Sequence, residues 1–374
     1  MRILHIYKDY FPVLGGIENH VKVLAEAQAA RGHDVTVLVA HPEPCTTIET
    51  VNGVRLIRAA RWGIVASTPI SPALFRWTAR LEADITHLHF PHPPGEVAHL
   101  FFGRARHMVI TYHSDIVRQR TLHTVYRPLL WRVLQRADRL IATSPLYIES
   151  SPYLHRFREK CVVVPLGTDL ERFDQVDAER VEALRHRLLP QLSSQRVLLF
   201  VGRLRYYKGL YDLLHALTEI PDAHLLVVGD GPMREPWGQL AHDLKLAGRV
   251  TFAGQVNDAD LPACYKLGDI FVLPANARAE AFGTVIIEAM AAGLPVVSTE
   301  VGSGTSWVNL HDVTGLIVPS RNAKALAQAA NRLLSDPARR AEMGRAARQR
   351  AQAEFSQETM VARVEQVYRS VLNA

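Results

Sequence analysis

The chain has 374 residues, of which 48% are hydrophobic and 21% are charged, so it can bury substantial cores and is not expected to be disordered. Its length favours two domains. The formal net charge of +6 at pH 7 favours phosphorylated ligands or anionic lipid surfaces, and it is too small to argue for a nucleic-acid partner.

Cysteine usage and hydropathy indicate a cytoplasmic protein. The chain has three cysteines, Cys45, Cys161 and Cys264. They are widely spaced and no pair has the spacing of a metal or redox site, so we expect reduced, inert thiols. The first eleven residues lack the apolar core of a signal peptide. No apolar run approaches the ~20 residues that a membrane-spanning helix needs.

The first half of the chain alternates predicted strands and helices. Residues 3–7 read as a short strand, a turn at Gly15-Gly16 follows, and residues 17–30 read as an amphipathic helix that Gly32 ends. The next strand, residues 34–40, is apolar throughout, as in the interior of a parallel sheet. Further strands are expected at residues 54–58, 85–89, 107–111, 140–142 and 161–164. This rhythm predicts a doubly wound parallel α/β sheet.

The second half of the chain shows a second alternation of predicted strands and helices. Its strands are expected at residues 196–201, 223–228, 250–253, 270–273, 295–298 and 315–318. A polar, helix-like stretch at 174–192 separates the halves, so we predict domains of residues 1–188 and 189–354. The last residues, 355–374, carry one apolar stripe at helical period and are expected to pack back on the first domain. Two such domains facing across a cleft would bind ligands at the carboxyl ends of their strands.

Residues 279–299 carry two carboxylates around a glycine turn. The helix expected after that turn is apolar nearly all round except for Glu288, and a buried carboxylate without a partner is costly. We expect free N–H groups of Thr284, Val285 and Ile286 at the helix start, which favour a phosphate or a sugar hydroxyl. The alternative is a plain helix with Glu280 as a favourable charge at its N-terminus.

Two cations follow the first strand of the second domain. Arg203 and Lys208 lie on a loop that opens a helix, a place suited to a diphosphate whose negative charge increases as it departs. Arginine offers a planar fork of donors and lysine a point charge. The alternative is a solvated basic loop.

The doublet Gly15-Gly16 lies between the first strand and the first helix. Backbone can approach a phosphate closely there, and the helix dipole favours an anion. The alternative is a sharp turn with no ligand. The dinucleotide fingerprint GxGxxG does not occur at this turn, which argues against a nicotinamide-dependent enzyme.

Histidines follow two strands of the first domain. His113 comes directly after one of them and could donate to a sugar hydroxyl or to a developing charge. Because the chain has 17 histidines, a lone one carries little weight. His87, His89 and His92 form another cluster, which we interpret as structural or substrate-positioning.

The sequence predicts no metal site. No group of histidines and carboxylates has a convincing ligand spacing. Asp258 and Asp260 form a DxD pattern that binds a metal–nucleotide complex in some sugar-transferring enzymes of another fold. Here the pair opens an expected helix, so we predict helix capping.

A basic segment extends from residue 118 to residue 139. Its arginines are Arg118, Arg120, Arg127, Arg132, Arg136 and Arg139. Apolar residues lie between them at helical spacing, which suits an anionic membrane surface, here the inner face of the plasma membrane. The alternative is an ordinary core helix with a solvated arginine face.

With these residues noted, the chain resembles glycosyltransferase family 4, the retaining GT-B enzymes, over nearly its full length. The resemblance rests on residues 15–18 (GGIE), His113, residues 165–169 (PLGTD), 202–204 (GRL), 208–209 (KG), 228–232 (VGDGP), 280–283 (EAFG), 288–291 (EAMA) and 314–316 (TGL). The most specific of these features is the pair of glutamates, Glu280 and Glu288, separated by seven residues.

The resemblance implies a nucleotide-diphosphate sugar as donor, bound mainly by the second domain, with acceptor binding in the first and no metal or other cofactor. It implies that Glu288 holds the ribose, that Arg203 and Lys208 neutralise the departing diphosphate, and that Glu280 holds the sugar. The implied catalytic residues are His113, Arg203, Lys208 and Glu280. The implied donor-binding residues are Gly15, Gly16, Arg203, Lys208, Val256, Glu280, Ala281, Phe282, Gly283, Thr284, Val285 and Glu288.

One segment departs from the pattern common in the family. Residues 301–307 read VGSGTSW, where two glycines and an acid are usual. This version is similar to a subgroup acting on cell-surface polysaccharides and lipid-linked oligosaccharides, often mannosyltransferases. It implies hexose transfer from GDP-mannose to a lipid-linked or polysaccharide acceptor. The alternatives are a UDP-glucose or other UDP-sugar enzyme of glycolipid synthesis, a GT-B epimerase or phosphorylase, and an inactive nucleotide-sugar-binding protein.

Overall fold

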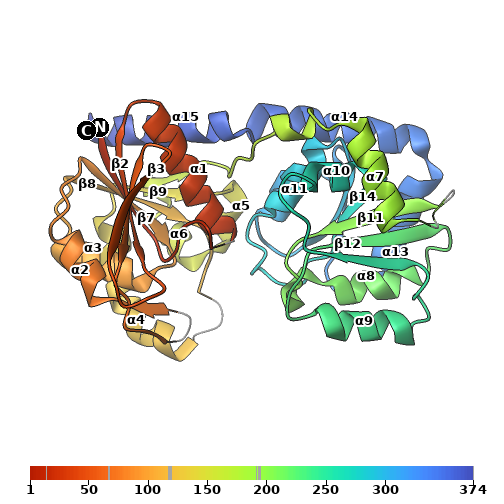
Figure 1. The fold of residues 1–374 in the computed structure, drawn as a ribbon, viewed down its shortest axis with the longest axis horizontal. Coiled ribbons are helices and arrows are strands. Elements are labelled where there is room, and N and C mark those ends of the chain that lie inside the picture. The colour runs from red at the N-terminus through yellow and green to blue at the C-terminus, as the bar shows by residue number, and fades with distance from the viewer. Residues whose placement is uncertain (14, 66–67, 117–119, 191, 193–194, 374) are drawn as a thin grey trace. The chain divides into compact units, whose positions relative to one another are not determined.

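The computed structural model describes residues 1–13, 15–65, 68–116, 120–190, 192 and 195–373. It divides into two compact units (Figure 1). Unit 1 consists of Met1–Leu166 together with Gln357–Ala374, and unit 2 consists of Gly167–Ser356. Each unit is an α/β sheet covered by helices, as the alternating pattern predicted.

The division between the units comes earlier in the chain than the expected junction at residues 188 and 189. Helix α7 (Ala178–Leu188) belongs to unit 2 and packs on α10 (Leu261–Lys266). The sequence predicted this polar, helix-like stretch at the end of the first domain, but the arginines of α7 bind it to unit 2. Arg180 lies 2.7 Å and Arg187 3.8 Å from carboxylate oxygens of Asp260.

Unit 1 is built on an eight-stranded sheet. Its strands, in spatial order, are β10 (Cys161–Val163), β9 (Arg139–Ala142), β8 (His107–Tyr112), β7 (Ile85–Phe90), β1 (Arg2–Ile6), β2 (Asp34–Ala40), β4 (Val54–Ala59) and β3 (Thr47–Val51). All neighbours are parallel except β3 and β4. The sequence did not predict β3, because this edge strand is largely exposed and lacks an apolar face.

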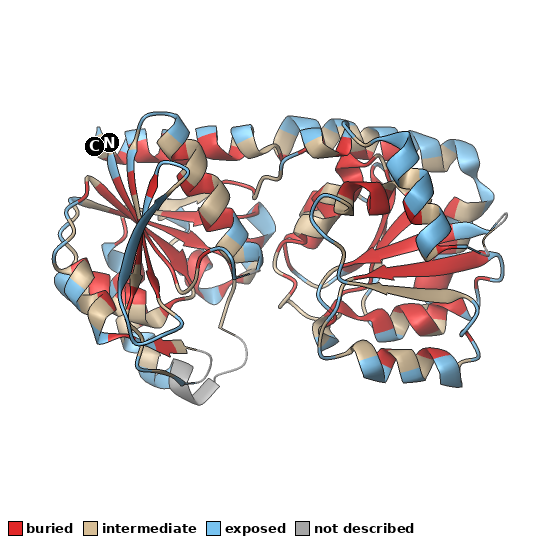
Figure 2. Ribbon diagram, viewed as in Figure 1, coloured by how far each residue is buried: buried red, intermediate tan, exposed pale blue. Residues whose placement is uncertain are grey.

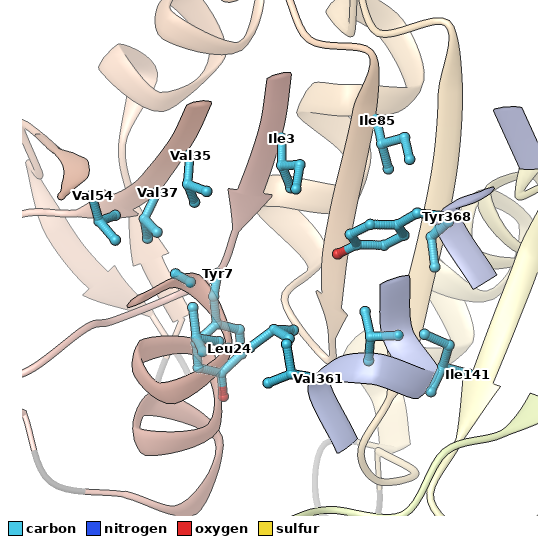
Figure 3. Packing of buried hydrophobic residues seen from close by; sticks show 14 of the residues in the cluster. Ile3, Tyr7, Leu24, Val35, Val37, Val54, Ile85, Ile141, Val361 and Tyr368 are labelled. Carbon is cyan, nitrogen blue, oxygen red and sulfur yellow. The ribbon is translucent and has the colours of Figure 1, made fainter. Parts of the chain in front are cut away.

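Helices from both ends of the chain cover one face of this sheet. Helix α1 (Gly16–Ala30) contacts α15 (Gln357–Leu372), and both contribute to one apolar cluster with the strands. Figure 3 shows Leu24 from α1 and Val361 and Tyr368 from α15 packed beside Ile3 and Ile85. The C-terminal helix is therefore part of the core of unit 1.

The remaining elements of unit 1 are further helices and a hairpin. They are β5 (Gly63–Val65), β6 (Thr68–Ile70), α2 (Pro72–Thr78), α3 (Pro93–Phe102), α4 (Arg120–Arg136), α5 (Pro145–Ser150), α6 (Pro152–Arg156) and η1 (Arg158–Lys160). In the view of Figure 1, α2, α3 and α4 lie on the side of the sheet away from α1 and α15.

Unit 2 is built on a six-stranded parallel sheet. Its strands, in spatial order, are β13 (Val250–Gly254), β12 (Ala223–Val228), β11 (Arg196–Val201), β14 (Ile270–Leu273), β15 (Val296–Glu300) and β16 (Gly315–Pro319). The chain starts at β11, builds outward to β13, and then returns to the other side of β11 with β14. A doubly wound sheet binds ligands at such a reversal point, outside the carboxyl ends of the strands.

Helices lie on both faces of this second sheet, whose central strands are buried (Figure 2). Besides α7 and α10 they are η2 (Glu171–Phe173), η3 (Tyr206–Lys208), α8 (Leu210–Leu217), α9 (Arg234–Asp243), α11 (Thr284–Ala291), α12 (Thr305–Val308), α13 (Ala323–Ser335) and α14 (Pro337–Glu354). Across the described parts of both units, no helix has the length and apolar character required to cross a bilayer.

The substitution Met360→Ala tests the contribution of α15 to unit 1. Met360 is 1% exposed within the apolar cluster, so its truncation should lower the free energy of unfolding by about 2–5 kcal/mol. Urea denaturation followed by circular dichroism measures the change. Gln366→Ala, on the exposed side of the same helix, should change it by less than ~0.5 kcal/mol. Equal effects of the two substitutions would contradict the packing of α15.

Candidate functional site

Lys208 and Glu280 meet at the reversal point of the unit 2 sheet. Lys208 ends η3 after β11, and Glu280 lies in the loop after the neighbouring strand β14. Lys208 Nζ is 2.7 Å from Glu280 Oε2, and each residue is 8% exposed. The contact lacks hydrogen-bond geometry at Glu280 Oε2. The carboxylate therefore keeps an acceptor position for a further hydrogen bond.

Glycines bring the two loops close enough for this pair to form. Gly209 has φ +71°, and a Cβ at this position would lie 1.8 Å from Pro274 O. Gly202 has φ +143°, and its Cβ position is 3.4 Å from Lys208 Nζ. The Asn276 N–H donates to Tyr207 O at 2.9 Å, which ties the loops together. Any side chain at Gly209 would push the loop carrying Lys208 away from β14.

The glycine turn before α11 is held by the segment after β15. Ser303 Oγ donates to Glu280 O at 2.7 Å, and the Gly304 N–H donates to Ala281 O at 2.8 Å. Ser303 is fully buried. The VGSGTSW segment, in which this sequence departs from the family pattern, therefore holds the backbone beside Glu280.

One predicted donor of the α11 start is already used. Gly283 has φ +80° and begins α11, as expected. The Ile286 N–H, expected to be free, donates to Gly283 O at 2.8 Å, because the turn tightens at the helix start. Thr284 and Val285 lie in the first turn of the helix. The side chain of Phe282 is buried, with its ring centroid 6.2 Å from that of Phe355.

Glu288 has a partner that the sequence did not reveal. Tyr265 Oη donates to Glu288 Oε2 at 2.7 Å. Burial raises the pKa of Glu288, while the hydrogen bond from Tyr265 and the positive charges of Arg172 and Lys208 oppose that rise. Burial, followed by the charge of Glu288, raises the pKa of Tyr265 well above its usual value. The tyrosine is on α10, and no sequence spacing connects it with Glu288.

The other donor-site candidates of unit 2 lie on loops at the same edge of the sheet. Arg203 is exposed and directly precedes the buried Leu204, whose N–H donates to Asp230 O at 2.9 Å. Val256 is half-buried and follows β13. The structure therefore pairs Lys208 with Glu280, and keeps Arg203 on the loop that carries Lys208.

The DxD pattern does not cap a helix as predicted. Asp260 precedes α10 without a side-chain capping hydrogen bond. Its carboxylate instead accepts from Arg180 Nε at 2.7 Å and from Asn257 Nδ2 at 2.9 Å. The capping prediction for Asp260 is wrong because α7 supplies arginines that compete for this carboxylate.

Gly15, Gly16 and His113 are the candidates that belong to unit 1. Gly15 precedes α1, and a Cβ there would meet the Glu18 carboxylate, whereas a Cβ on Gly16 would point into open space. His113 follows β8 and is 5% exposed, and its backbone N–H donates to the backbone oxygen of Phe90 at 3.1 Å. Burial lowers the pKa of His113 well below its usual value, so the ring is neutral.

The structure also gathers histidines that sequence spacing did not connect. His5, His20, His87 and His89 are buried beside His113. Two trios of nitrogens lie within 4.8 Å of one another, His5–His87–His89 and His20–His89–His113, and so does the group His41, Glu43 and Cys45. The interpretation that no group of histidines and carboxylates has ligand spacing is corrected. Each histidine trio combines residues of separate elements, which sequence spacing does not connect, whereas His41, Glu43 and Cys45 lie within one five-residue segment.

The basic segment is an ordinary core helix on one side. Arg118 lies outside the described residues, as do the side chains of Arg120 and Leu122. Leu130, Val133 and Leu134 of α4 are fully buried. They cannot form the apolar face toward a membrane that the spacing suggested.

The outer side of α4 is basic and also carries the exposed Val125, and further apolar side chains are exposed on other elements of unit 1. Its exposed arginines are Arg127, Arg132 and Arg136. The large exposed apolar side chains of unit 1 include Trp62, Ile64, Val65, Phe101 and Val125. A cavity of about 680 Å³ is lined by apolar side chains of the hairpin and of α2 and α3, among them Ile70, Phe75, Val97 and Phe102.

Comparisons with known proteins extend over both units. Residues 14–172 match the model described as Glycosyltransferase Family 4, and residues 187–350 match that described as Glycosyl transferases group 1. The chain is 38% identical over 362 residues to D-rhamnosyltransferase WbpZ of Pseudomonas aeruginosa, covering 95% of this chain and 92% of that protein. It is 35% identical over 378 residues to O-antigen chain mannosyltransferase C of Escherichia coli, covering 100% of both.

Among solved structures, the chain is similar to sucrose-phosphate synthase from Thermosynechococcus elongatus. The TM-score is 0.83 at 27% sequence identity, covering 100% of this chain and 99% of that one.

The substitution Gly209→Ala tests how the glycines place Lys208. The added Cβ would collide with Pro274 O in a backbone conformation that alanine disfavours, so the free energy of unfolding should fall by about 1–3 kcal/mol. Thermal unfolding by calorimetry measures the loss. Gly248→Ala provides the control, since nothing lies within 4 Å of its Cβ position. A variant at Gly209 as stable as that control would contradict the close approach of the loops.

Proposed function

Because the chain belongs to glycosyltransferase family 4, with the GT-B fold and a retaining hexosyltransferase activity, we propose that it transfers mannose from GDP-mannose to a lipid-linked or polysaccharide acceptor. The product would be part of a cell-surface glycan. The observation that carries the proposal is the pairing of Lys208 and Glu280 at the reversal point of the unit 2 sheet.

Lys208 and Arg203 are assigned to the leaving group. Departure of the sugar leaves additional negative charge on the diphosphate, and a cation already fixed in a site with little water stabilises that charge in the transition state. Lys208 is such a cation, held by Glu280 and by the glycines beside it. Arg203, on the same loop, offers a planar fork for two phosphate oxygens.

The two glutamates are assigned to hydroxyl groups of the donor. Glu280 Oε2 has an acceptor position that no described residue uses as a hydrogen-bond partner, and it would accept from a hydroxyl of the transferred sugar. Glu288 would accept from the ribose, with Tyr265 orienting its carboxylate. The N–H groups of the turn from Phe282 to Thr284 would supply donors to the sugar or phosphate.

In this proposal unit 1 binds the acceptor and contacts part of the donor. His113 would contact the sugar near the reacting carbon, and Gly15 and Gly16 would approach the phosphate. The acceptor hydroxyl would lose its proton to a diphosphate oxygen as the bond to the leaving group breaks, with retention at the anomeric carbon. No metal takes part in this scheme.

The names of the relatives support a sugar of the manno series. One relative is a D-rhamnosyltransferase and another an O-antigen chain mannosyltransferase, and D-rhamnose is mannose without the 6-hydroxyl. GDP-mannose is therefore the first donor to test, followed by the GDP-linked 6-deoxy sugar. UDP-glucose represents the alternative donor class.

A lipid-linked acceptor agrees with the surface of unit 1. The apolar cavity of about 680 Å³ could hold a hydrocarbon segment, and the exposed arginines of α4 would favour anionic headgroups. We propose that the protein is cytoplasmic and associates peripherally with the inner face of the plasma membrane through this side of unit 1.

Transfer of labelled mannose tests the function and the role of Lys208 together. The protein should transfer mannose from GDP-mannose to an O-antigen-type saccharide acceptor, and not glucose from UDP-glucose. Lys208→Ala should lower kcat by ~10² or more, since it removes a charge aimed at the leaving group. Product formation is measured by chromatography.

Lys324→Ala is the matched control, because Lys324 is exposed at the start of α13. Its kcat should equal that of the parent. Near-parental kcat in Lys208→Ala would remove this residue from the mechanism. Hydrolysis of every sugar nucleotide without transfer to any acceptor would contradict the proposed transferase.

Sedimentation with vesicles tests the membrane association. Replacement of Arg127, Arg132 and Arg136 by glutamine should reduce binding to phosphatidylglycerol vesicles by about tenfold or more, since each basic residue near an anionic surface contributes ~1 kcal/mol. Replacement of Arg321, Lys324 and Arg345 by glutamine changes net charge equally on exposed positions of unit 2. Equal sedimentation of both triple variants would reject the basic face of α4 as the contact.

A further inference from the structure

Five polar side chains line one face of the unit 1 sheet in register. His5 on β1 pairs with His87 on β7, and His89 on β7 pairs with Thr111 on β8. His113 follows two residues after Thr111. Since side chains alternate along a strand, these residues share one face of the sheet. This face is the one that carries Gln28 of α1 and Tyr368 of α15.

Hydrogen bonds connect these residues into one chain. Gln28 Oε1 is 2.8 Å from His5 Nε2, and His5 Nδ1 is 3.1 Å from His89 Nε2. His89 Nδ1 is 3.2 Å from His113 Nε2. All four residues are at least nine-tenths buried. This hydrogen-bond chain therefore extends from α1, through β1 and β7, to His113 at the carboxyl edge of the sheet.

The direction of each hydrogen bond follows from the first one. An amide oxygen only accepts, so His5 Nε2 donates to Gln28. Burial lowers the pKa of His5 to about 4 and that of His89 well below its usual value, so each ring is neutral and carries one N–H. His5 Nδ1 must then accept from His89 Nε2, and His89 Nδ1 must accept from His113 Nε2. His113 is left with a bare lone pair on Nδ1.

A second branch fixes the orientation of the Gln28 amide. Gln28 Nε2 donates to Tyr368 Oη at 3.4 Å, and Tyr368 Oη is 2.6 Å from His87 Nδ1. His87 Nε2 is 2.7 Å from Thr111 Oγ1. Tyr368 lies among the apolar side chains of the unit 1 core (Figure 3). Helix α15 therefore contributes the Tyr368 hydroxyl. This hydroxyl accepts from the Gln28 amide, whose oxygen is the first acceptor of the hydrogen-bond chain.

A metal centre is the competing interpretation of the same residues. Ligands of one metal point at a common position, whereas here the nitrogens of His5, His89 and His113 point at one another with hydrogen-bond geometry. Neighbouring rings of the chain are stacked, with interplanar angles of 26° and 20°. His20 lies edge-on to the rings of His89 and His113. The arrangement favours a hydrogen-bond chain.

We propose that Gln28, His5 and His89 are positioning residues that hold His113 in the tautomer with a bare Nδ1, so that His113 accepts a hydrogen bond from a substrate hydroxyl. This inference rests on the proposed function, which assigns the contact of His113 with the sugar. It replaces the expectation that His113 donates. Nδ1 of His113 is buried and has no hydrogen-bond partner among the described residues, so no described group uses this lone pair.

Nuclear magnetic resonance of the full-length protein, labelled with ¹⁵N-histidine, tests the series of hydrogen bonds without any substrate. The spectra should show scalar coupling across two N–H···N hydrogen bonds, from His89 Nε2 to His5 Nδ1 and from His113 Nε2 to His89 Nδ1. Absence of both couplings in the folded protein would overturn the proposal. A stoichiometric metal in the purified protein, with histidine signals that change when it is chelated, would also overturn it.

Variants of His89 test the positioning role. His89→Leu breaks the chain and should lower kcat about tenfold, the size expected for one lost hydrogen bond. His89→Gln can still accept from His113 and donate to His5, so kcat should recover. Both variants should bind GDP with the affinity of the parent protein. Most of the proposed GDP contacts are in unit 2, and the two in unit 1, Gly15 and Gly16, are not members of the hydrogen-bond chain. His224→Leu removes a buried histidine from β12 and controls for destabilisation.

The failure of this inference differs from failure of the proposed function. Couplings without transfer activity would contradict the proposed transferase and leave the hydrogen-bond chain in place. Transfer activity without couplings would contradict the chain alone. Equal kcat in His89→Leu and in the parent would overturn the positioning role even if the couplings are present.

Discussion

The close approach of Lys208 and Glu280 is the contact on which the candidate site depends. A lysine and a glutamate that are both 8% exposed would be costly to bury separately, because a charge without a partner loses its hydration. Together they can lie at the carboxyl edge of β11 and β14, where a doubly wound sheet opens to ligands. The pair keeps a cation fixed before any substrate arrives, and under the proposed function this cation would stabilise a departing diphosphate without reorganisation.

Much of the fold could be predicted from sequence, because buried parallel strands read as continuous apolar runs between glycine turns. This pattern identified every strand of the unit 2 sheet and the parallel strands of unit 1. It missed β3, whose residues are largely exposed. It recognised α7 as helix-like but assigned it to the first domain, because the contacts of its arginines with Asp260 in unit 2 depend on tertiary structure.

The candidate site was predictable only where neighbouring residues act together. The glycine turn and its two glutamates lie within one short segment, so their spacing was informative. The hydrogen-bond partners of those glutamates could not be predicted from spacing, because Tyr265 and Ser303 come from other elements of unit 2. The histidine chain shows the same limit. His87 and His89 stand two apart on one strand, a spacing that places both on one face, but His5, Gln28 and Tyr368 join them only through strand register and helix packing. Both units thus arrange polar groups at the carboxyl edge of a sheet, with charges in unit 2 and neutral rings in unit 1.

The central claim is that the Lys208–Glu280 pair marks the place where a nucleotide sugar binds. A crystal structure of the full chain with GDP bound tests this most directly. The account predicts that a β-phosphate oxygen lies within hydrogen-bond distance of Lys208 Nζ and that the ribose hydroxyls lie against the Glu288 carboxylate. GDP bound at another edge of the sheet, with the contact between Lys208 and Glu280 unchanged and no phosphate beside it, would contradict the account.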